Sequence, residues 1–374
     1  MPDSIDRRSF LKRGSRTLGG AALLGVGGPG LLEACSSTSS KSTSTSPSGA
    51  SAAGGGSGAA GRFGHLDLQL PWIKNVESAG EFIADSQGIY TAQGFASVNL
   101  IAAGPSATPQ ETMVQTKKAF MAITSPDATA AAIAKGFTLK VIGTEYQKNP
   151  FCIMSAATKP IKTPQDMIGK KIGVQSVNEA VWAAFLKANN LDASKIQKVS
   201  VSFDPTPVTQ GTVDGWFSFV TNEPVELKLK GFDTVTFLLN DYNYPEVGNV
   251  FIVRTDALKD SRDKVKAAMT AEILAWKKSI ADPQAGADLA ATKYGQGLDA
   301  KEQALESAAQ NKLVATGDAL SHGLFYMTPE AQAATLKTLA LGGTTLTASQ
   351  IFDMSILDEI YASADMKAVT APSA

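Results

Sequence analysis

Histidine and cysteine are nearly absent from this chain, which has two of each among its 374 residues. Zinc sites and histidine-based hydrolases need several such side chains, and neither an HExxH motif nor a glycine-rich phosphate-binding P-loop occurs. The sequence therefore argues against a metal enzyme or a histidine-based hydrolase and leaves carboxylate chemistry open. We expect no cofactor. Cys152 follows Phe151 in an apolar run, so we interpret it as a buried, unreactive thiol.

The chain also lacks an excess of charge of one sign. It has 34 lysine and arginine residues against 35 aspartate and glutamate residues, a formal net charge of −1. Nucleic-acid-binding domains commonly carry a basic surplus, so we expect no nucleic-acid partner. A long hydrophobic run is missing as well. The apolar, glycine-rich stretch at 18–32 has about 15 residues, which is too short to span a bilayer as a helix.

The first 35 residues have the pattern of a twin-arginine export signal that ends at a lipidation cysteine. Arg7 and Arg8 precede the apolar stretch, and residues 31–35 read Leu-Leu-Glu-Ala-Cys, which is similar to a bacterial lipobox. We interpret residues 1–34 as a signal peptide and Cys35 as the lipidation site. The alternative is a plain signal peptide with an incidental cysteine.

Residues 35–62 are interpreted as the lipid anchor site followed by a flexible linker. They are mostly serine, threonine, glycine and alanine, a composition that cannot bury apolar surface. The expected location follows from the signal and the linker together. The protein would be exported and held by lipid at the outer face of the cytoplasmic membrane, on the cell surface or in the periplasm.

Beyond the linker, strand-like and helix-like segments alternate, which predicts an α/β fold. The alternation runs once, starts again, and is followed by a mostly helical tail. This order predicts two lobes, with residues 63–157 and 250–374 in lobe 1 and residues 158–249 in lobe 2. The apolar segments at 151–157 and 249–254 are the predicted crossovers between the lobes.

Local patterns predict which residues cap helices and which tryptophans lie in the core. Two capping boxes are expected at helix starts, one from Thr108 with Glu111 and one from Ser176 with Glu179. Tryptophans inside runs with helical periodicity are expected in the core. These tryptophans are Trp182 and Trp276.

Three blocks of the sequence resemble the NMT1/THI5-like (SsuA/ThiY-like) substrate-binding proteins. The blocks are residues 72–94, which begin Trp-Ile-Lys-Asn, residues 161–174 and residues 211–224. The resemblance implies a two-lobed fold of the periplasmic-binding-protein type II class, a Venus flytrap with two crossover segments at its hinge. It further implies a monomeric receptor, not an enzyme, that passes a small-molecule ligand to the permease of an ABC transporter.

Members of that family bind chemically different ligands. Trp72 and Asn75, spaced as Trp-x-x-Asn, resemble members that carry thiamine pyrimidine precursors or riboflavin. The resemblance therefore implies a small aromatic heterocycle in the interlobe cleft. One alternative is a nitrate-, sulfonate- or taurine-binding protein of the same fold. The other is a pyrimidine-biosynthesis enzyme of the THI5 type, whose Cys-rich motif and active-site histidine are not found in this sequence.

The candidate ligand contacts are polar and aromatic residues at the strand ends and helix starts that face the cleft of such a fold. They are Trp72, Asn75, Glu77, Ser125, Pro126, Tyr146, Asn178, Trp216, Asn222, Glu223 and Tyr242. Trp72 and Trp216 are expected to clamp a planar ring from opposite lobes. Asn75 and Ser125 are equally expected to cap helices, and Glu77 to bind a ligand amine or to stabilise a helix N-terminus.

Overall fold

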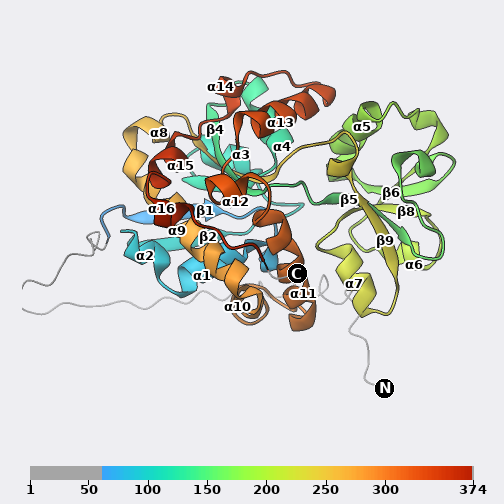
Figure 1. The fold of residues 1–374 in the computed structure, drawn as a ribbon, viewed down its shortest axis with the longest axis horizontal. Helices are drawn as coiled ribbons and strands as arrows, with labels where there is room; N and C mark the ends of the chain where they lie inside the picture. Colours follow the sequence, from blue (N-terminus) through green and yellow to red (C-terminus); the bar gives the residue numbers. More distant parts are fainter. Residues whose placement is uncertain (1–60, 373–374) are drawn as a thin grey trace, which may run out of the picture. The chain divides into compact units, whose positions relative to one another are not determined.

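The computed structural model describes residues 61–372. The predicted export signal, Cys35 and nearly all of the predicted linker therefore lie outside the described residues. Within 61–372, the chain forms two five-stranded sheets together with the helices that pack on them (Figure 1). No helix in this part of the chain combines the length and the apolar character that crossing a membrane requires.

The first sheet has the strand order β2-β1-β3-β10-β4. Its strands are β1 (His65–Gln69), β2 (Ser97–Ile101), β3 (Met121–Thr124), β4 (Leu139–Tyr146) and β10 (Gly248–Arg254). β1 pairs in parallel with β2 and β3, whereas β10 runs antiparallel to β3 and β4. Because β10 lies between two strands that precede it by about a hundred residues, the chain returns to this sheet after building the second one.

The second sheet has the strand order β7-β6-β8-β5-β9. Its strands are β5 (Phe151–Ala156), β6 (Lys171–Gln175), β7 (Gln197–Val201), β8 (Gly215–Phe219) and β9 (Thr234–Leu238). β6 is parallel to β7 and β8, and β5 is antiparallel to β8 and β9. The chain passes between the sheets twice, from β4 to β5 and from β9 to β10. This arrangement confirms the predicted two-lobed α/β class with two crossover segments. The crossovers themselves lie at 147–150 and 239–247, because the predicted segments 151–157 and 249–254 form β5 and β10, each within one sheet. Residues 151–157, predicted in lobe 1, therefore belong mainly to the second sheet.

Most helices belong to the first lobe, where their apolar side chains share one core with the first sheet. These helices are α1 (Ala79–Ser86), α2 (Ile89–Ala92), α3 (Gln110–Gln115), α4 (Pro126–Ala134), α8 (Ala257–Asp260), α9 (Arg262–Ala281), α10 (Pro283–Leu289), α11 (Ala300–Val314), α12 (Asp318–His322), α13 (Pro329–Leu341), α14 (Ala348–Ile351), α15 (Ser355–Ile360) and α16 (Ala364–Lys367). The 3-10 turn η2 (Val76–Ser78) and the π-helical turn η7 (Ala290–Tyr294) also lie in this lobe.

The second lobe has fewer helices, and its core is divided over the two faces of its sheet. Its helices are α5 (Glu179–Ala188), α6 (Thr206–Thr209) and α7 (Glu223–Leu229). Its 3-10 turns are η3 (Pro164–Met167), η4 (Ser176–Asn178), η5 (Ala193–Lys195) and η6 (Leu239–Asp241).

Large side chains fill both cores. In the first lobe, α1 packs against α9 with the Trp276 indole directly over Gly80. In the second lobe, the ring of Trp182 lies 6.5 Å from that of Phe217, centroid to centroid. Both tryptophans are buried, as predicted. Cys152 on β5 is a buried free thiol, and burial raises its pKa, which agrees with the expected lack of reactivity.

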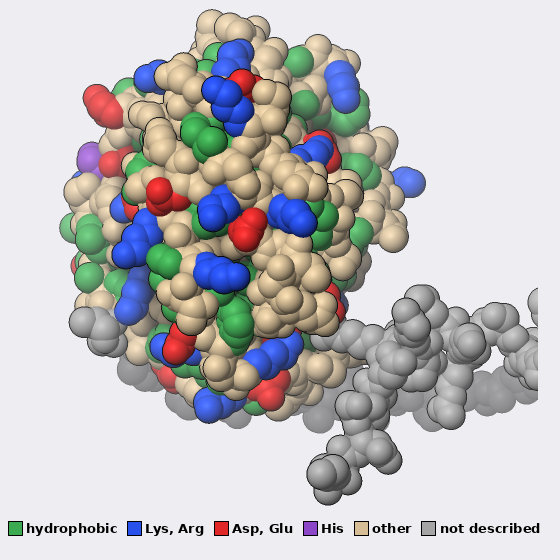
Figure 2. Space-filling view, turned by 90° about the vertical axis from the view of Figure 1, so that its right-hand side faces the viewer, with side chains coloured by type: hydrophobic (Ala, Val, Ile, Leu, Met, Phe, Trp, Pro, Cys, Tyr) green, Lys and Arg blue, Asp and Glu red, His purple; other side chains and the backbone are tan. Residues whose placement is uncertain are grey.

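Charged side chains of both signs are spread over the face seen in Figure 2, which is the side of the second lobe. Two ion pairs on this lobe join Lys198 to Glu179 and Lys230 to Glu226.

The predicted capping box of Ser176 with Glu179 does not form, because the Glu179 carboxylate pairs with Lys198 instead. Residues Ser176–Asn178 form a 3-10 turn, so α5 begins one turn later than predicted and has no side-chain cap.

Candidate functional site

A cavity of about 470 Å³ lies between the two lobes. Its first-lobe wall comes from the segments that follow β1, β2 and β3, and its second-lobe wall from the ends of β5, β6 and β8. These segments meet because the carboxyl ends of neighbouring parallel strands lie at one edge of a sheet. The volume falls within the range of about 300–1,000 Å³ that is usual for small-molecule sites.

Two aromatic rings from opposite lobes meet at this cavity. Trp72 follows β1 of the first lobe, and Phe203 follows β7 of the second. Their ring centroids are 5.4 Å apart, and the planes are inclined by 60°. Phe203 is 42% exposed, which is unusual for a phenylalanine. The contact is therefore a link between lobes and leaves much of the phenylalanine surface free for a further partner.

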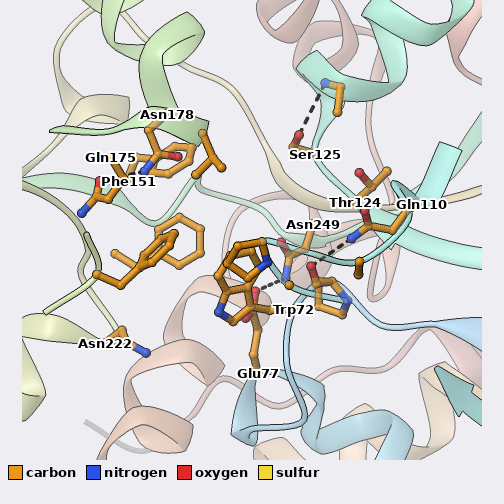
Figure 3. Close-up of a pocket in the computed structure, with 18 of the residues that line it drawn as sticks. Trp72, Glu77, Gln110, Thr124, Ser125, Phe151, Gln175, Asn178, Asn222 and Asn249 are labelled. Carbon is orange, nitrogen blue, oxygen red and sulfur yellow. Dashed lines mark hydrogen bonds between the residues drawn. The ribbon is translucent and has the colours of Figure 1, made fainter. Parts of the chain in front are cut away.

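A second aromatic group forms the inner wall on the second lobe. Phe151 on β5 lies 4.9 Å from Phe217 and 4.8 Å from Phe219, both on the neighbouring strand β8. All three residues line the cavity. Amide side chains of Gln175, Asn178 and Asn222 complete this wall (Figure 3). The second lobe thus presents flat apolar surface edged by neutral hydrogen-bonding groups.

Two of the predicted caps on the first lobe are present. The Asn75 side chain accepts a hydrogen bond from the Glu77 backbone N–H at 3.2 Å, and the Ser125 hydroxyl accepts one from the Ala128 N–H at 3.4 Å. Both residues also line the cavity. Capping and ligand contact are compatible at these positions, because a cap lies at the exposed end of its helix.

Three carboxyl groups line the cavity, and two are already engaged. Glu111 accepts a hydrogen bond of 2.6 Å from the Thr124 hydroxyl. This contact replaces the expected capping box with Thr108, because α3 begins after Pro109 without a side-chain cap. Glu223 accepts one bond of 2.7 Å from the Ser218 hydroxyl and another of 3.1 Å from the Phe219 N–H. Burial raises the pKa of both carboxyls.

Glu77 is the third carboxyl group, and it lies beside Trp72 at the floor of the cavity (Figure 3). Its Oε1 accepts a hydrogen bond of 3.0 Å from the Nδ2 of Asn249, a β10 residue. Burial raises the pKa of Glu77 to about 7. Among the described residues that line the cavity, none is lysine, arginine or histidine. The cavity therefore offers acceptors and aromatic surface, and no cationic side chain.

Seven of the eleven predicted contacts line the cavity, and four do not. The seven are Trp72, Asn75, Glu77, Ser125, Asn178, Asn222 and Glu223. Pro126 is buried at the start of α4, and Tyr146 is buried in the first lobe with its hydroxyl donating to Gln310 Oε1 at 3.1 Å. Trp216 is fully buried on the face of the second sheet that packs on α6 and α7. It therefore does not oppose Trp72 across the cavity, and Phe203 occupies that place.

Tyr242 is the fourth of these corrections. Its hydroxyl donates to the Lys162 carbonyl at 3.2 Å, and its ring packs on Phe237 with centroids 5.2 Å apart. A tyrosine next to a crossover segment was expected to face the cleft. The chain instead turns at η6 so that this ring covers the edge of the second-lobe core.

Other cavity residues were not among the predicted contacts. They include Gln110, Phe151, Gln175, Phe203 and Asn249. The sequence feature that could have identified them is their position, because each lies at or near the end of a strand or the start of a helix. The sequence does not say which of several residues at such an end turns inward.

No group of three or more His, Cys, Asp and Glu side chains in residues 61–372 is arranged to hold a metal ion. The carboxyl groups around the cavity face hydroxyl, amide and backbone donors instead. The chemistry that the arrangement supports is hydrogen bonding and ring stacking.

Comparisons with known proteins agree with this architecture. The family model described as NMT1/THI5 like matches residues 75–286. The riboflavin-binding protein RibY of Chloroflexus aurantiacus is 23% identical over 226 residues, which cover 59% of this chain and 64% of that protein. The chain thus matches less than two thirds of the length of this curated relative.

Solved structures share the fold at low sequence identity. The aliphatic sulphonate binding protein SsuA from Escherichia coli has a TM-score of 0.59 at 17% identity, covering 74% of this chain and 86% of SsuA. The nitrate-binding protein NrtA from Synechocystis has a TM-score of 0.57 at 11% identity, covering 82% of this chain and 92% of NrtA. Both are periplasmic binding proteins, so the chain has the fold of that class.

Proposed function

Because the chain belongs to the NMT1/THI5 like family, we propose that it is an extracytoplasmic solute-binding protein that serves an ABC importer. The two-lobed fold and the cavity between the lobes support this role. The predicted export signal and lipidation at Cys35 agree with it and remain predictions, because those residues lie outside the described part of the chain.

The proposed ligand is a small, flat aromatic nitrogen heterocycle, such as a thiamine pyrimidine precursor or a riboflavin-like ring. One observation carries this choice: the described cavity lining combines five aromatic side chains with no cationic one. Aromatic faces contribute large contact area at low cost in side-chain entropy. The relative named as a riboflavin-binding protein supports a ring compound.

Nitrate, sulfonates and taurine fit this cavity less well. An anion needs a guanidinium, an ammonium or several free N–H groups to replace its hydration, and this lining instead has three carboxyl groups. SsuA and NrtA, whose names state such ligands, share the fold at 17% and 11% identity.

The transport role follows from a two-state argument. A ligand that touches both lobes lowers the free energy of the closed form, because only that form makes both sets of contacts. The hinge is formed by the connections between β4 and β5 and between β9 and β10. The closed form would be what the permease recognises, and no bond in the ligand needs to change. We therefore propose a monomeric receptor without catalytic turnover.

Calorimetry with a ligand panel tests the proposal. The panel contains riboflavin, an aminopyrimidine alcohol, taurine, an alkanesulfonate and nitrate. We expect saturable binding of a ring compound, recovery of that compound unchanged by chromatography, and no heat with the anions. Consumption of the ring compound would indicate an enzyme. Binding restricted to the anions would contradict the proposed ligand class.

A further inference from the structure

The floor of the cavity has two hydrogen-bond acceptors side by side. The Nδ2 of Asn249 donates to Glu77 Oε1 and to Glu145 Oε2, each at 3.0 Å. Both N–H groups of this amide are therefore used, and its Oδ1 has no hydrogen-bond partner in residues 61–372. Glu77 Oε2 has none either. Asn249 and Glu77 both line the cavity, and neither of these two oxygens is used by another described residue (Figure 3).

The orientation of the Asn249 amide is set by its surroundings. With the amide turned over, its Oδ1 would face the Glu77 carboxylate, which has no proton to donate when it is ionised. The backbone of Asn249 has φ 51°, in the left-handed region that asparagine tolerates better than most residues. Asn249 lies at the start of β10, and this backbone conformation places its side chain between Glu77 and Glu145.

The surroundings of Glu77 contain no compensating positive charge. The titratable groups that face it are Glu81 on α1, Tyr146 on β4 and Glu306 on α11. Behind Asn249 lie Glu145, Glu81 and Glu272, which are all fully buried. Burial raises the pKa of each of these three carboxyls, which favours their neutral form, and none of the three brings a positive charge to the subsite.

We propose that Glu77 and Asn249 form a subsite for the amidinium-like edge of a cationic flat ligand, meaning two adjacent N–H donors such as a protonated aminopyrimidine presents. One N–H donates to Glu77 Oε2 and the other to Asn249 Oδ1, while Trp72 and Phe203 contact the ring. This inference rests on the proposed function and narrows it to a ligand with donor and cationic character. A neutral ring of the same shape would donate without charge assistance, and an anionic one would place its charge against the Glu77 carboxylate.

The other two carboxyl groups of the cavity do not compete for this role. Glu111 is tied to Thr124 within the first lobe, and Glu223 is tied to Ser218 and Phe219 within the second. Glu77 is bound by a single amide that it shares with the buried carboxyl group of Glu145. Its Oε2 has no hydrogen-bond partner among the described residues and retains the capacity to accept from a ligand.

A charge series of isosteric probes tests the subsite. Benzamidine is a cationic amidine, benzamide its neutral analogue and benzoate its anionic analogue. At about pH 8 we expect benzamidine to bind about tenfold more tightly than benzamide by calorimetry, with no benzoate binding, since charge-assisted hydrogen bonds are roughly twice as strong as neutral ones. Glu77→Gln should reduce this preference to about twofold or less.

Dependence on pH gives a second readout. Benzamidine stays cationic across the range, so its affinity should rise as Glu77 ionises through its pKa of about 7. The same titration of Glu77→Gln should be flat. Glu272→Gln is the matched control, because it removes a buried carboxyl from the same lobe without touching the cavity lining, and it should keep the rise.

The outcomes separate this inference from the proposed function. If benzamide, or the neutral ring of riboflavin, binds as tightly as benzamidine, the subsite is wrong and the heterocycle receptor stands. If no flat ring of any charge binds a protein with a native circular dichroism spectrum, the proposed ligand class fails and the subsite fails with it. A benzamidine preference that survives Glu77→Gln would also overturn the subsite.

Discussion

At the scale of single residues, the unexpected feature is which aromatic ring opposes Trp72. Trp216 and Phe217 are neighbours on β8, and alternate residues of a strand point to opposite faces of the sheet. Trp216 is buried with Val208 and Leu227, whereas Phe217 is buried on the other face with Phe185. The ring across from Trp72 comes from a loop instead, at Phe203.

Removing the Phe203 ring should therefore weaken ligand binding. For Phe203→Ala we expect a loss of about 1–2 kcal/mol in the binding free energy of a planar ligand, because the exposed aromatic surface beside Trp72 is lost. Calorimetry against the best ring compound of the panel measures this loss. Leu320→Ala is the control, since Leu320 is 45% exposed on α12 and does not line the cavity. Equal affinities for the two variants would remove Phe203 from the site.

At the scale of helices and strands, close packing of α1 on α9 holds the segment that carries the site. α1 follows η2, which contains Glu77, so a shift of α1 moves the cavity floor. A Cβ atom added at Gly80 would lie 2.1 Å from Nε1 of Trp276, much closer than any real contact. Glycine at this position is thus a packing requirement of the two helices, not a need for an unusual backbone.

The substitution Gly80→Ala should destabilise the protein. We expect the free energy of unfolding to fall by about 1–3 kcal/mol, because the Trp276 ring must leave its place in a filled core. Urea unfolding followed by tryptophan fluorescence measures it. At Gly342 a new Cβ would lie no closer than 3.4 Å to other atoms, and φ is −74°, so Gly342→Ala should be neutral or slightly stabilising. A harmless Gly80→Ala would contradict the close packing of these helices.

At the scale of the whole molecule, most of the buried glutamates without a cationic partner among the described residues lie in the first lobe. Tyr90 donates its hydroxyl to Glu272, and Glu306 accepts from Gln303 Nε2 at 2.9 Å. Burial raises the pKa of Glu306 to about 9 from an ordinary value of 4.5. The folded protein therefore holds protons near neutral pH that the unfolded chain releases.

Proton retention makes stability depend on pH with a definite sign. A carboxyl group whose pKa is higher in the folded protein than in the unfolded chain stabilises the fold in its protonated form. This stabilisation is complete at a pH below the pKa in the unfolded chain. It is lost as the pH rises through the pKa in the folded protein. We expect the free energy of unfolding to decrease from about pH 5 to about pH 9. The substitution Glu306→Gln should make this decrease shallower, by up to about 1.4 kcal/mol per pH unit.

Urea unfolding at several pH values checks the slope. Glu330→Gln, at an exposed position on α13, should keep the wild-type slope. A stability that rises with pH, or an identical slope for Glu306→Gln, would contradict proton retention in the buried carboxyl groups.

The sequence by itself determined the two-lobed α/β order, the caps at Asn75 and Ser125, and the burial of Trp182 and Trp276. These features depend on apolar periodicity and on contacts between residues close in the chain, which a pattern can express. The tertiary structure alone decided that Phe203 contacts Trp72 and that Asn249 donates a hydrogen bond to Glu77, which lies 172 positions earlier in the chain. Such contacts depend on how two sheets approach each other and on which face of a strand each side chain takes, and a shift of one residue reverses that face.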